Sequence, residues 1–524
     1  MRLTLTLSFL PSVLCAVPTV AQKAPANLDR YVSRVLETFT VPGLSVAIVK
    51  DGRVVSAKGY GVRRLEQPAP VDERTRFGIA SNTKLFTATA LGLLVEEGRL
   101  EWDAPVIRYL PWFTMYDPYV TRELSVRDLL VHRSGLGLGA GDLLWWPPST
   151  YDRKEIARRL RFIPPATSFR SAYAYDNVLY LVAGEVIEAV SGQTWEEFVR
   201  SRILRKVGMT ESDVLHSGAG GAGNVAGTHA EVEGTVRPIA PFLSDNTNPA
   251  GGIMSSAVDM AKWMIVQLDS GKVAGGEPLF SPATTMQLWR EVTPMPIGTP
   301  PAGLPHLRPR MAGYALGLNV RDYRGRILLQ HTGGLPGYLS KVAMIPELRL
   351  GVAVLTNQES GAAFESIVHH VLDHYLGAKA PDYPMRYRQM VEKGRAELQA
   401  LEQRATASRD STSGPSLPLA KYAGRYRDPW YGDVAISLDG KGLVIRFGHT
   451  PSLVGDMRHW QHDTFLVRWR DRELRADAYA TFGLNYDGSI AQLRMVPSSP
   501  AVDFSFDFQD LVLRPVPTDS GTAR

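Results

Sequence analysis

Three short motifs, widely separated along the chain, constrain the fold of this protein more than any other feature. Ser81 and Lys84 stand at the start of an apolar helical run, Tyr175 and Asn177 form the second motif, and His331-Thr332-Gly333 forms the third. Serine, lysine, tyrosine and histidine side chains supply nucleophiles and proton carriers. A fold that brings these segments together would form a serine acyl-transfer site, and this is what the motifs predict.

The first motif has the spacing of a nucleophile and its base. Residues three apart on a helix lie on one face, so Ser81 and Lys84 can touch. A neutral amine can accept the serine proton during attack on a carbonyl, provided that its pKa lies well below the usual value of about 10.4. The apolar residues that follow, such as Leu85 and Phe86, would bury Lys84 and lower its pKa. The alternative is an ordinary helix start, with Ser81 as N-cap and Lys84 in solvent.

The second and third motifs lie on extended segments. Tyr175 and Asn177 alternate, so both side chains can point to one side before helical periodicity resumes. Strands are predicted over Arg326 to Gln330, ending at His331, and over Tyr338 to Ile345. Glycines between the two strands allow a ligand to approach the backbone closely. Taken alone, His331 would be interpreted as an ordinary strand histidine beside a turn.

In this order the motifs resemble the S-x-x-K, Y-x-N and K-T-G elements of the β-lactamase, penicillin-binding protein and D-aminopeptidase superfamily. Residues 124–136 and 249–260 also resemble segments of its class C β-lactamase and esterase branch. The resemblance extends from Leu28 to Ala378. It implies an α/β, β-lactamase-like fold, in which an antiparallel sheet flanked by helices is combined with an all-helical half and the site lies between them.

The resemblance also implies a role for each motif residue. Ser81 is the expected nucleophile, Lys84 its base, and Tyr175 the group that relays a proton to the leaving group. The backbone N–H groups of Ser81 and Gly334 would stabilise the oxyanion. The residues expected to bind substrate are Asn177, His331, Thr332, Gly333 and Gly334. No metal and no other cofactor is implied.

Two residues depart from the family pattern. His331 stands where β-lactamases and DD-peptidases usually carry lysine, and histidine is mostly neutral above about pH 6.5. The missing cation favours a peptidase or esterase of the D-aminopeptidase kind. A β-lactamase or DD-carboxypeptidase, and a non-catalytic protein that binds peptidoglycan fragments, remain the alternatives. Asp176 occupies a position where a small residue is common, and its carboxylate is expected at the surface.

The N-terminus and the charge distribution predict an exported protein. Residues 1–21 have a short basic start, an apolar stretch and small residues near the end, as in a cleavable signal peptide. The only cysteine, Cys15, lies inside this segment, so the mature chain would have no disulfide. No dense Lys/Arg run suggests nucleic acid, and no later apolar run approaches the roughly twenty residues of a spanning helix. We expect a periplasmic or secreted protein that acts on a small peptide, ester or β-lactam; an oligomer is possible.

Composition shifts divide the chain. A hydrolase domain is expected over 22–380, a charged helix and flexible linker over 381–418, a β-barrel over 419–516 and a tail over 517–524. Short strands follow one another from Tyr422 to Leu513, the last of them predicted over Phe504 to Leu513. The segment Leu419–Tyr426 resembles the start of a lipocalin-like module that is often appended to this family.

Three further groups of residues allow more than one interpretation. Trp145 and Trp146 could line the substrate groove or anchor a packed loop. His370 and His374 have the spacing of a metal pair on one helix face, but a sheet-covering helix with polar edges is the favoured interpretation. His132 is expected to be structural, holding the turn that surrounds it.

Overall fold

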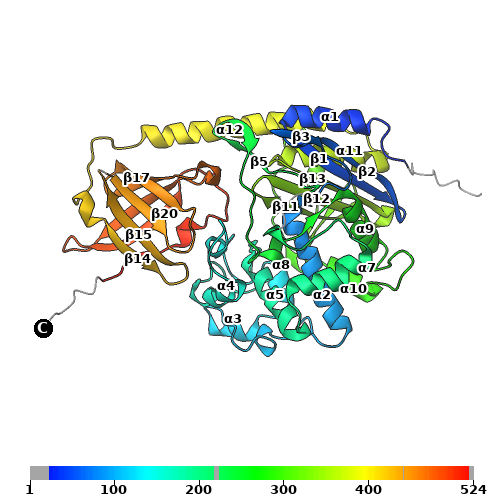
Figure 1. The fold of residues 1–524 in the computed structure, drawn as a ribbon, viewed down its shortest axis with the longest axis horizontal. Helices are drawn as coiled ribbons and strands as arrows, with labels where there is room; N and C mark the ends of the chain where they lie inside the picture. The colour runs from blue at the N-terminus through cyan, green and yellow to red at the C-terminus, as the bar shows by residue number, and fades with distance from the viewer. Residues whose placement is uncertain (1–22, 218–222, 441, 518–524) are drawn as a thin grey trace, which may run out of the picture.

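The computed structural model describes residues 23–217, 223–440 and 442–517 (Figure 1). The predicted signal peptide with Cys15, most of the tail, and part of the glycine-rich loop at 217–228 lie outside the described residues. Figure 1 shows a larger α/β unit and a smaller β unit, joined by the long helix α12 (Tyr383–Ala407) that lies along one edge of the molecule. Among the described residues, no helix is both long and apolar enough to cross a membrane.

An antiparallel sheet forms the centre of the larger unit. Within the described residues it has nine strands in the order β3-β2-β1-β13-β12-β11-β10-β9-β8. The N-terminal hairpin turns at Asp51-Gly52, as the sequence predicts, and its first strand pairs with β13 from the far end of the domain. The strands are β1 (Gly43–Lys50), β2 (Arg53–Arg64), β3 (Gln67–Pro70), β8 (Thr293–Pro294), β9 (Ala312–Tyr314), β10 (Asn319–Tyr323), β11 (Arg326–Leu335), β12 (Tyr338–Ile345) and β13 (Leu350–Thr356).

Both faces of this sheet are covered. Alternate residues of β1, such as Val46 and Ile48, pack with α1 (Leu28–Phe39) and α11 (Gly361–Tyr375), while Ala47 and Val49 belong to the core on the other face. Because side chains alternate along a strand, a strand covered on both sides is apolar throughout. This explains why β1 is buried at every position.

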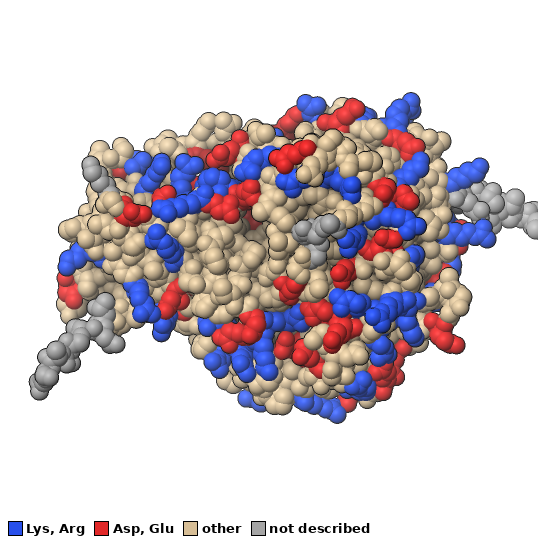
Figure 2. Space-filling view, viewed as in Figure 1, with Lys and Arg blue, Asp and Glu red and all other residues tan. Residues whose placement is uncertain are grey.

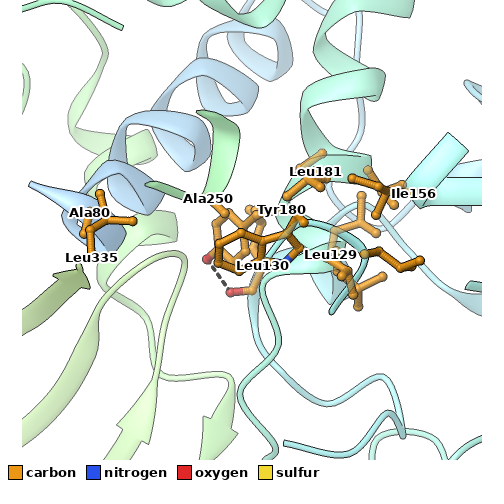
Figure 3. Close-up of a cluster of buried hydrophobic side chains, with 14 of the residues drawn as sticks. Ala80, Leu129, Leu130, Ile156, Tyr180, Leu181, Ala250 and Leu335 are labelled. Atoms are coloured by element: carbon orange, nitrogen blue, oxygen red, sulfur yellow. Dashed lines mark hydrogen bonds between the residues drawn. The ribbon is translucent and has the colours of Figure 1, made fainter. Parts of the chain in front are cut away.

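The helical half lies beyond the second face of the sheet. Its central helix, α2 (Lys84–Glu96), is buried almost all round and packs against α5 (Val178–Ser191). Figure 3 shows the buried side chains around this contact, including the phenol of Tyr180, which donates to the Leu130 carbonyl at 2.7 Å. The other helices are α3 (Pro118–Glu123), α4 (Arg153–Arg159), α6 (Trp195–Phe198), α7 (Arg205–Val207), α8 (Asn248–Gly251), α9 (Ala257–Leu268) and α10 (Pro282–Trp289).

The C-terminal unit is a nearly closed antiparallel barrel. Its described strands run in the order β20-β19-β18-β17-β16-β15-β14-β21, and a bridge between Leu493 and Leu513 joins the two ends. They are β14 (Gly424–Asp428), β15 (Gly432–Asp439), β16 (Gly442–Phe447), β17 (Val454–Gln461), β18 (Thr464–Trp469), β19 (Ala478–Leu484), β20 (Ile490–Pro497) and β21 (Arg514–Pro515). The strand predicted over Phe504 to Leu513 is wrong: this segment is a loop with one 3₁₀ turn. Its alternating phenylalanines mimic a strand pattern, but they pack against the barrel core and the larger unit.

The barrel is docked on the larger unit. Tyr151 donates to the Tyr431 carbonyl at 2.5 Å, and Arg159 to the Trp430 carbonyl at 3.0 Å. Residues 408–418, predicted as a flexible linker, are held on the barrel surface, where Asp410 N donates to Gln461 at 2.9 Å. On the face shown in Figure 2, charged side chains of both signs are interspersed over both units.

Candidate active site

The first motif sits at a sharp turn between sheet and helix. Strand β4 (Phe77–Gly78) leads into the 3₁₀ turn η1 (Ala80–Thr83), and α2 begins at Lys84. Ala80 has a left-handed φ of 47°, which is uncommon for a residue with a side chain. The turn leaves Ser81 partly accessible while its neighbours are buried. A strained turn that presents one hydroxyl suits a nucleophile.

Lys84 is buried and makes three contacts. Its Nζ lies 3.0 Å from Ser81 Oγ, 2.7 Å from Asn177 Oδ1 and 3.0 Å from the Ala250 carbonyl. The amide oxygen and the carbonyl can only accept hydrogen bonds. The ammonium form of Lys84 can donate to all three oxygens, whereas the neutral amine can satisfy these two acceptors with its N–H groups and direct its lone pair at the hydroxyl of Ser81. Burial lowers the pKa of Lys84 to about 7, against the opposing charges of Asp142 and Asp176.

Tyr175 contacts the nucleophile from a second side. Its OH donates to Ser81 Oγ at 2.9 Å, and its ring lies tilted against His132 with centroids 4.3 Å apart. Burial raises the pKa of Tyr175 well above its ordinary value, so the phenol keeps its proton. His132 accepts a hydrogen bond from Asp176 N at 3.2 Å and so holds the backbone of the second motif.

Asn177 is held from both ends of its amide. Its oxygen accepts from Lys84, and its nitrogen donates to Asp142 Oδ2 at 2.9 Å. Asp142 is fully buried at the start of the turn η4 (Asp142–Leu144) and also accepts from Trp145 Nε1 and Ser505 Oγ, each at 2.9 Å. Burial raises the pKa of Asp142 to about 7, although these hydrogen bonds and Lys84 oppose the rise. Asn177 thus links the base to a buried carboxyl group.

The third motif lies within β11, beside the first. His331 Nδ1 is 2.6 Å from the Thr332 carbonyl and must donate to it, so Nε2 accepts from Tyr314 OH at 2.8 Å. Burial and the nearby Lys84 lower the pKa of His331 to about 3, which leaves the imidazole neutral. A Cβ on Gly333 would lie 2.1 Å from the Ile79 carbonyl, so only glycine allows β11 to pack this closely on the turn before Ser81.

The comparisons with known proteins agree with this geometry. Residues 28–376 match the family described as Beta-lactamase. The chain belongs to this family. Residues 408–515 match a second family, described as a domain of unknown function, DUF3471.

Relatives of this Beta-lactamase family member include enzymes. It is 28% identical over 442 residues to the unguisins hydrolase ungD of Aspergillus violaceofuscus, covering 79% of this chain and 76% of the relative. It is 26% identical to penicillin-binding protein 4 of Amycolatopsis lactamdurans, over 65% of this chain and 88% of that protein. The octameric penicillin-binding protein homologue from Pyrococcus abyssi aligns over 90% of this chain and 98% of its own, with a TM-score of 0.58 and 23% identity. The predicted fold class and the assignment as a serine hydrolase of this family are confirmed.

A cleft of about 820 Å³ opens between the two units, and its lining includes Gly334, the residue after the third motif. Its apolar lining includes Trp146, Phe242 and Phe506, and Trp146 stacks on Phe242 with centroids 5.6 Å apart. Trp145 is buried and donates to Asp142 instead. The two tryptophans that the sequence treats alike therefore differ: one lines a cleft, and the other anchors a loop.

Two predicted positions need correction in this Beta-lactamase family site. Asp176 is fully buried, not at the surface, because it lies two residues before the buried helix α5, and burial raises its pKa to about 7. The side chain of Thr332, predicted to bind substrate, lines a hollow on the opposite face of the sheet with Lys341 and Glu365. Strand alternation sends it away from His331. The structure brings the remaining predicted residues together around Ser81.

His370 and His374 lie away from this site. His370 stacks on Tyr31 with centroids 3.8 Å apart, and His374 contacts the Lys23 carbonyl at 3.3 Å. Within the part of the chain that the structure describes, no group of three His, Cys, Asp or Glu side chains could hold a metal ion.

Sequence reasoning missed the partners that hold the motif residues. They are Asp142, Tyr314, Ser505 and Asp507. No local pattern marks them, since each acts on a motif that is distant in the chain. Only Asp142 could have been suspected from the sequence, because it lies three residues before the Trp145-Trp146 pair.

Proposed function

We propose that this chain is an exported serine hydrolase that forms an acyl-enzyme at Ser81 with peptide or ester substrates, as D-aminopeptidases and related esterases do. The observation that carries the proposal is the contact set of Lys84. Its two pure acceptors, Asn177 Oδ1 and the Ala250 carbonyl, can take up both N–H groups of the neutral amine and so leave its lone pair toward Ser81 Oγ. A general base needs this geometry and a pKa near the working pH.

Acylation follows from these contacts. Ser81 Oγ attacks the substrate carbonyl carbon while its proton passes to Lys84 Nζ. The backbone N–H groups of Ser81 and Gly334 would stabilise the oxyanion, at about 3 kcal/mol for each donor. The bond to the leaving group then breaks. Tyr175, which contacts Ser81 Oγ, relays the proton from Lys84 to the leaving amine or alcohol. Water attacks the resulting ester in the same way and releases the acid and free Ser81.

The charges of the cleft favour a neutral or cationic substrate. Its described lining includes the carboxylates of Glu359, Asp471, Glu473 and Asp503 and the cation Arg475, and Glu473 also pairs with Arg237 at 2.8 Å, so that two of the four carboxylates have an ion partner. Arg475 pairs with Glu359 at 2.5 Å. A surface with excess negative charge repels an anionic substrate and attracts an amine. The neutral His331 adds no cation that would recognise a substrate carboxylate. These features support an aminopeptidase or esterase more than a carboxypeptidase.

β-Lactam hydrolysis is the second candidate, because penicillin-binding protein 4 of Amycolatopsis lactamdurans is among the relatives. β-Lactams carry a carboxylate, and the neutral His331 offers it no cation. Turnover of penicillins is therefore expected to be slower than turnover of esters or D-amino-acid anilides.

The test is labelling and turnover with the mature protein. A serine-reactive phosphonate should add to Ser81, as located by mass spectrometry of peptides, and nitrophenyl esters or D-amino-acid anilides should be turned over faster than a penicillin. Ser81→Ala should abolish both, while Ser171→Ala, an exposed serine in the same domain, should change neither. Labelling that persists in Ser81→Ala would refute the proposal.

Export through a signal peptide over residues 1–21 is part of the proposal. Expression of the full gene in a Gram-negative host, followed by N-terminal sequencing of the protein from the periplasm and medium, tests it. A mature N-terminus close to Gln22 is expected, and an intact N-terminus in the cytoplasm would contradict it.

A further inference from the structure

The loop that follows β20 leaves the barrel and lies against the catalytic half. Phe504 packs on Gly139, where a Cβ would meet the phenylalanine ring at 2.7 Å, and its ring lies edge-on to Tyr175 with centroids 6.1 Å apart. Ser505 is buried and donates to Asp142 Oδ2 at 2.9 Å. This loop, residues 499–508, therefore reaches the second catalytic motif from another domain.

Asp507 fixes the backbone on either side of Asp142. Its two carboxyl oxygens accept from Gly141 N at 2.6 Å and from Leu143 N at 3.0 Å. Asp507 and Asp142 are both fully buried. A buried polar group is costly unless its hydrogen bonds are satisfied. Removing the barrel loop would leave two backbone N–H groups and one carboxyl group of the catalytic half without these partners.

A continuous chain of hydrogen bonds connects this loop to the nucleophile. It runs from Ser505 Oγ to Asp142 Oδ2, through the Asn177 amide to Lys84 Nζ, and on to Ser81 Oγ, with steps of 2.9, 2.9, 2.7 and 3.0 Å. We propose that Ser505 and Asp507 are positioning residues of the active site, which hold Asp142 and thereby the orientation and protonation of Lys84, so that the catalytic half is complete only with the barrel docked. This inference rests on the proposed function of Lys84 as the base.

The charged groups around this chain of hydrogen bonds decide whether loss of Ser505 raises or lowers the pKa of Lys84. Asp142 and Asp176 are the carboxyl groups that face Lys84, Asp507 faces Asp142, and burial keeps His132 and His331 neutral. An ionised Asp142 stabilises the ammonium form of Lys84, and the Ser505 hydroxyl stabilises the ionised Asp142. Loss of that hydroxyl favours neutral Asp142 and with it neutral Lys84. The acid limb of the pH profile should then move to lower pH.

The experiment measures the rate of acylation of the full mature chain by a non-ionising ester as a function of pH. Ser505→Ala should move the acid limb down by about half a pH unit or more and reduce the plateau rate by roughly tenfold. Ser505→Thr keeps the hydroxyl and should restore the wild-type profile. Ser489→Ala is the matched control, because this exposed barrel serine also donates to a carboxylate, Asp487 Oδ1, at 2.6 Å.

A double mutant tests whether Ser505 acts through Asp142 or only by stabilising the local structure. In the Asp142→Asn background the charge that Ser505 acts on is gone, so Ser505→Ala should cause no further shift of the limb. If Ser505→Ala does not fold by circular dichroism, Ser505→Cys, which still fills the site but offers only a weak S–H donor, replaces it. A wild-type profile in folded Ser505→Ala, or in Ser505→Cys where it replaces that variant, with Ser81 still labelled, would overturn this inference alone. An unlabelled Ser81 in the wild type would instead overturn the proposed function.

Discussion

The phenol of Tyr314 donates a hydrogen bond of 2.8 Å to Nε2 of His331, and this contact gives the unprotonated nitrogen of the neutral imidazole a partner. Both ring nitrogens of His331 are engaged, and its side chain is buried. The position that carries a cation in most β-lactamase-like sites is therefore uncharged here.

Tyr314→Phe should lower the free energy of unfolding by about 1–3 kcal/mol, because it leaves a buried imidazole nitrogen without a donor. Chemical denaturation followed by tryptophan fluorescence measures this difference. Tyr116→Phe is the control, since Tyr116 is 57% exposed and its loss should change the free energy little. Equal stability of the two variants would mean that water replaces the phenol without cost.

Lys84→Ala should reduce the rate of acylation by about 10³-fold, in the range typical of a lost general base. The reason is geometric: Ser81 Oγ has no other base among its described contacts. Stopped-flow measurement of the nitrophenol burst gives the rate. Lys58→Ala removes an exposed lysine that pairs with Asp29 at 2.9 Å and should leave the burst unchanged.

The pH dependence should report the pKa of Lys84. Its neutral form is the active one, so kcat/KM should rise with pH through about 7, where burial places that pKa, and then stay level. Tyr175 should add no limb below pH 10, because its pKa is raised well above the ordinary value. A profile measured with a non-ionising ester that instead falls between pH 7 and 9 would contradict the assignment of Lys84 as the base.

Trp145 and Trp146 should behave differently when replaced by alanine. Trp146→Ala removes a cleft wall and should raise KM for apolar substrates by roughly tenfold, while kcat for a small acetate ester stays the same. Trp145→Ala should destabilise the fold by about 3–5 kcal/mol, since it empties a buried volume and removes a donor to Asp142. Thermal unfolding and steady-state kinetics with two substrate sizes distinguish these outcomes.

Much of the fold could be predicted because its signals are local. The hairpin at Asp51-Gly52, the continuous apolar strand β1 and the helix α1 follow from turn chemistry and periodicity over a few residues. The strand predicted from Phe504 to Leu513 was wrong for the same reason, because it too rested on a local pattern. Its alternating aromatic residues satisfy the strand pattern, and only the surface of the other domain explains why they form a docking loop.

The chemistry of the site could be predicted from short stretches of the sequence. Spacing along one helix turn places Lys84 beside Ser81, and alternation places Tyr175 and Asn177 on one side, because these relations depend on backbone geometry over at most four residues. The tertiary structure alone decided that Asp176 is buried and that Ser505 reaches Asp142 across 363 positions of the chain. Such contacts depend on how whole domains pack, and desolvation, which sets the pKa of Lys84, exists only once they have packed.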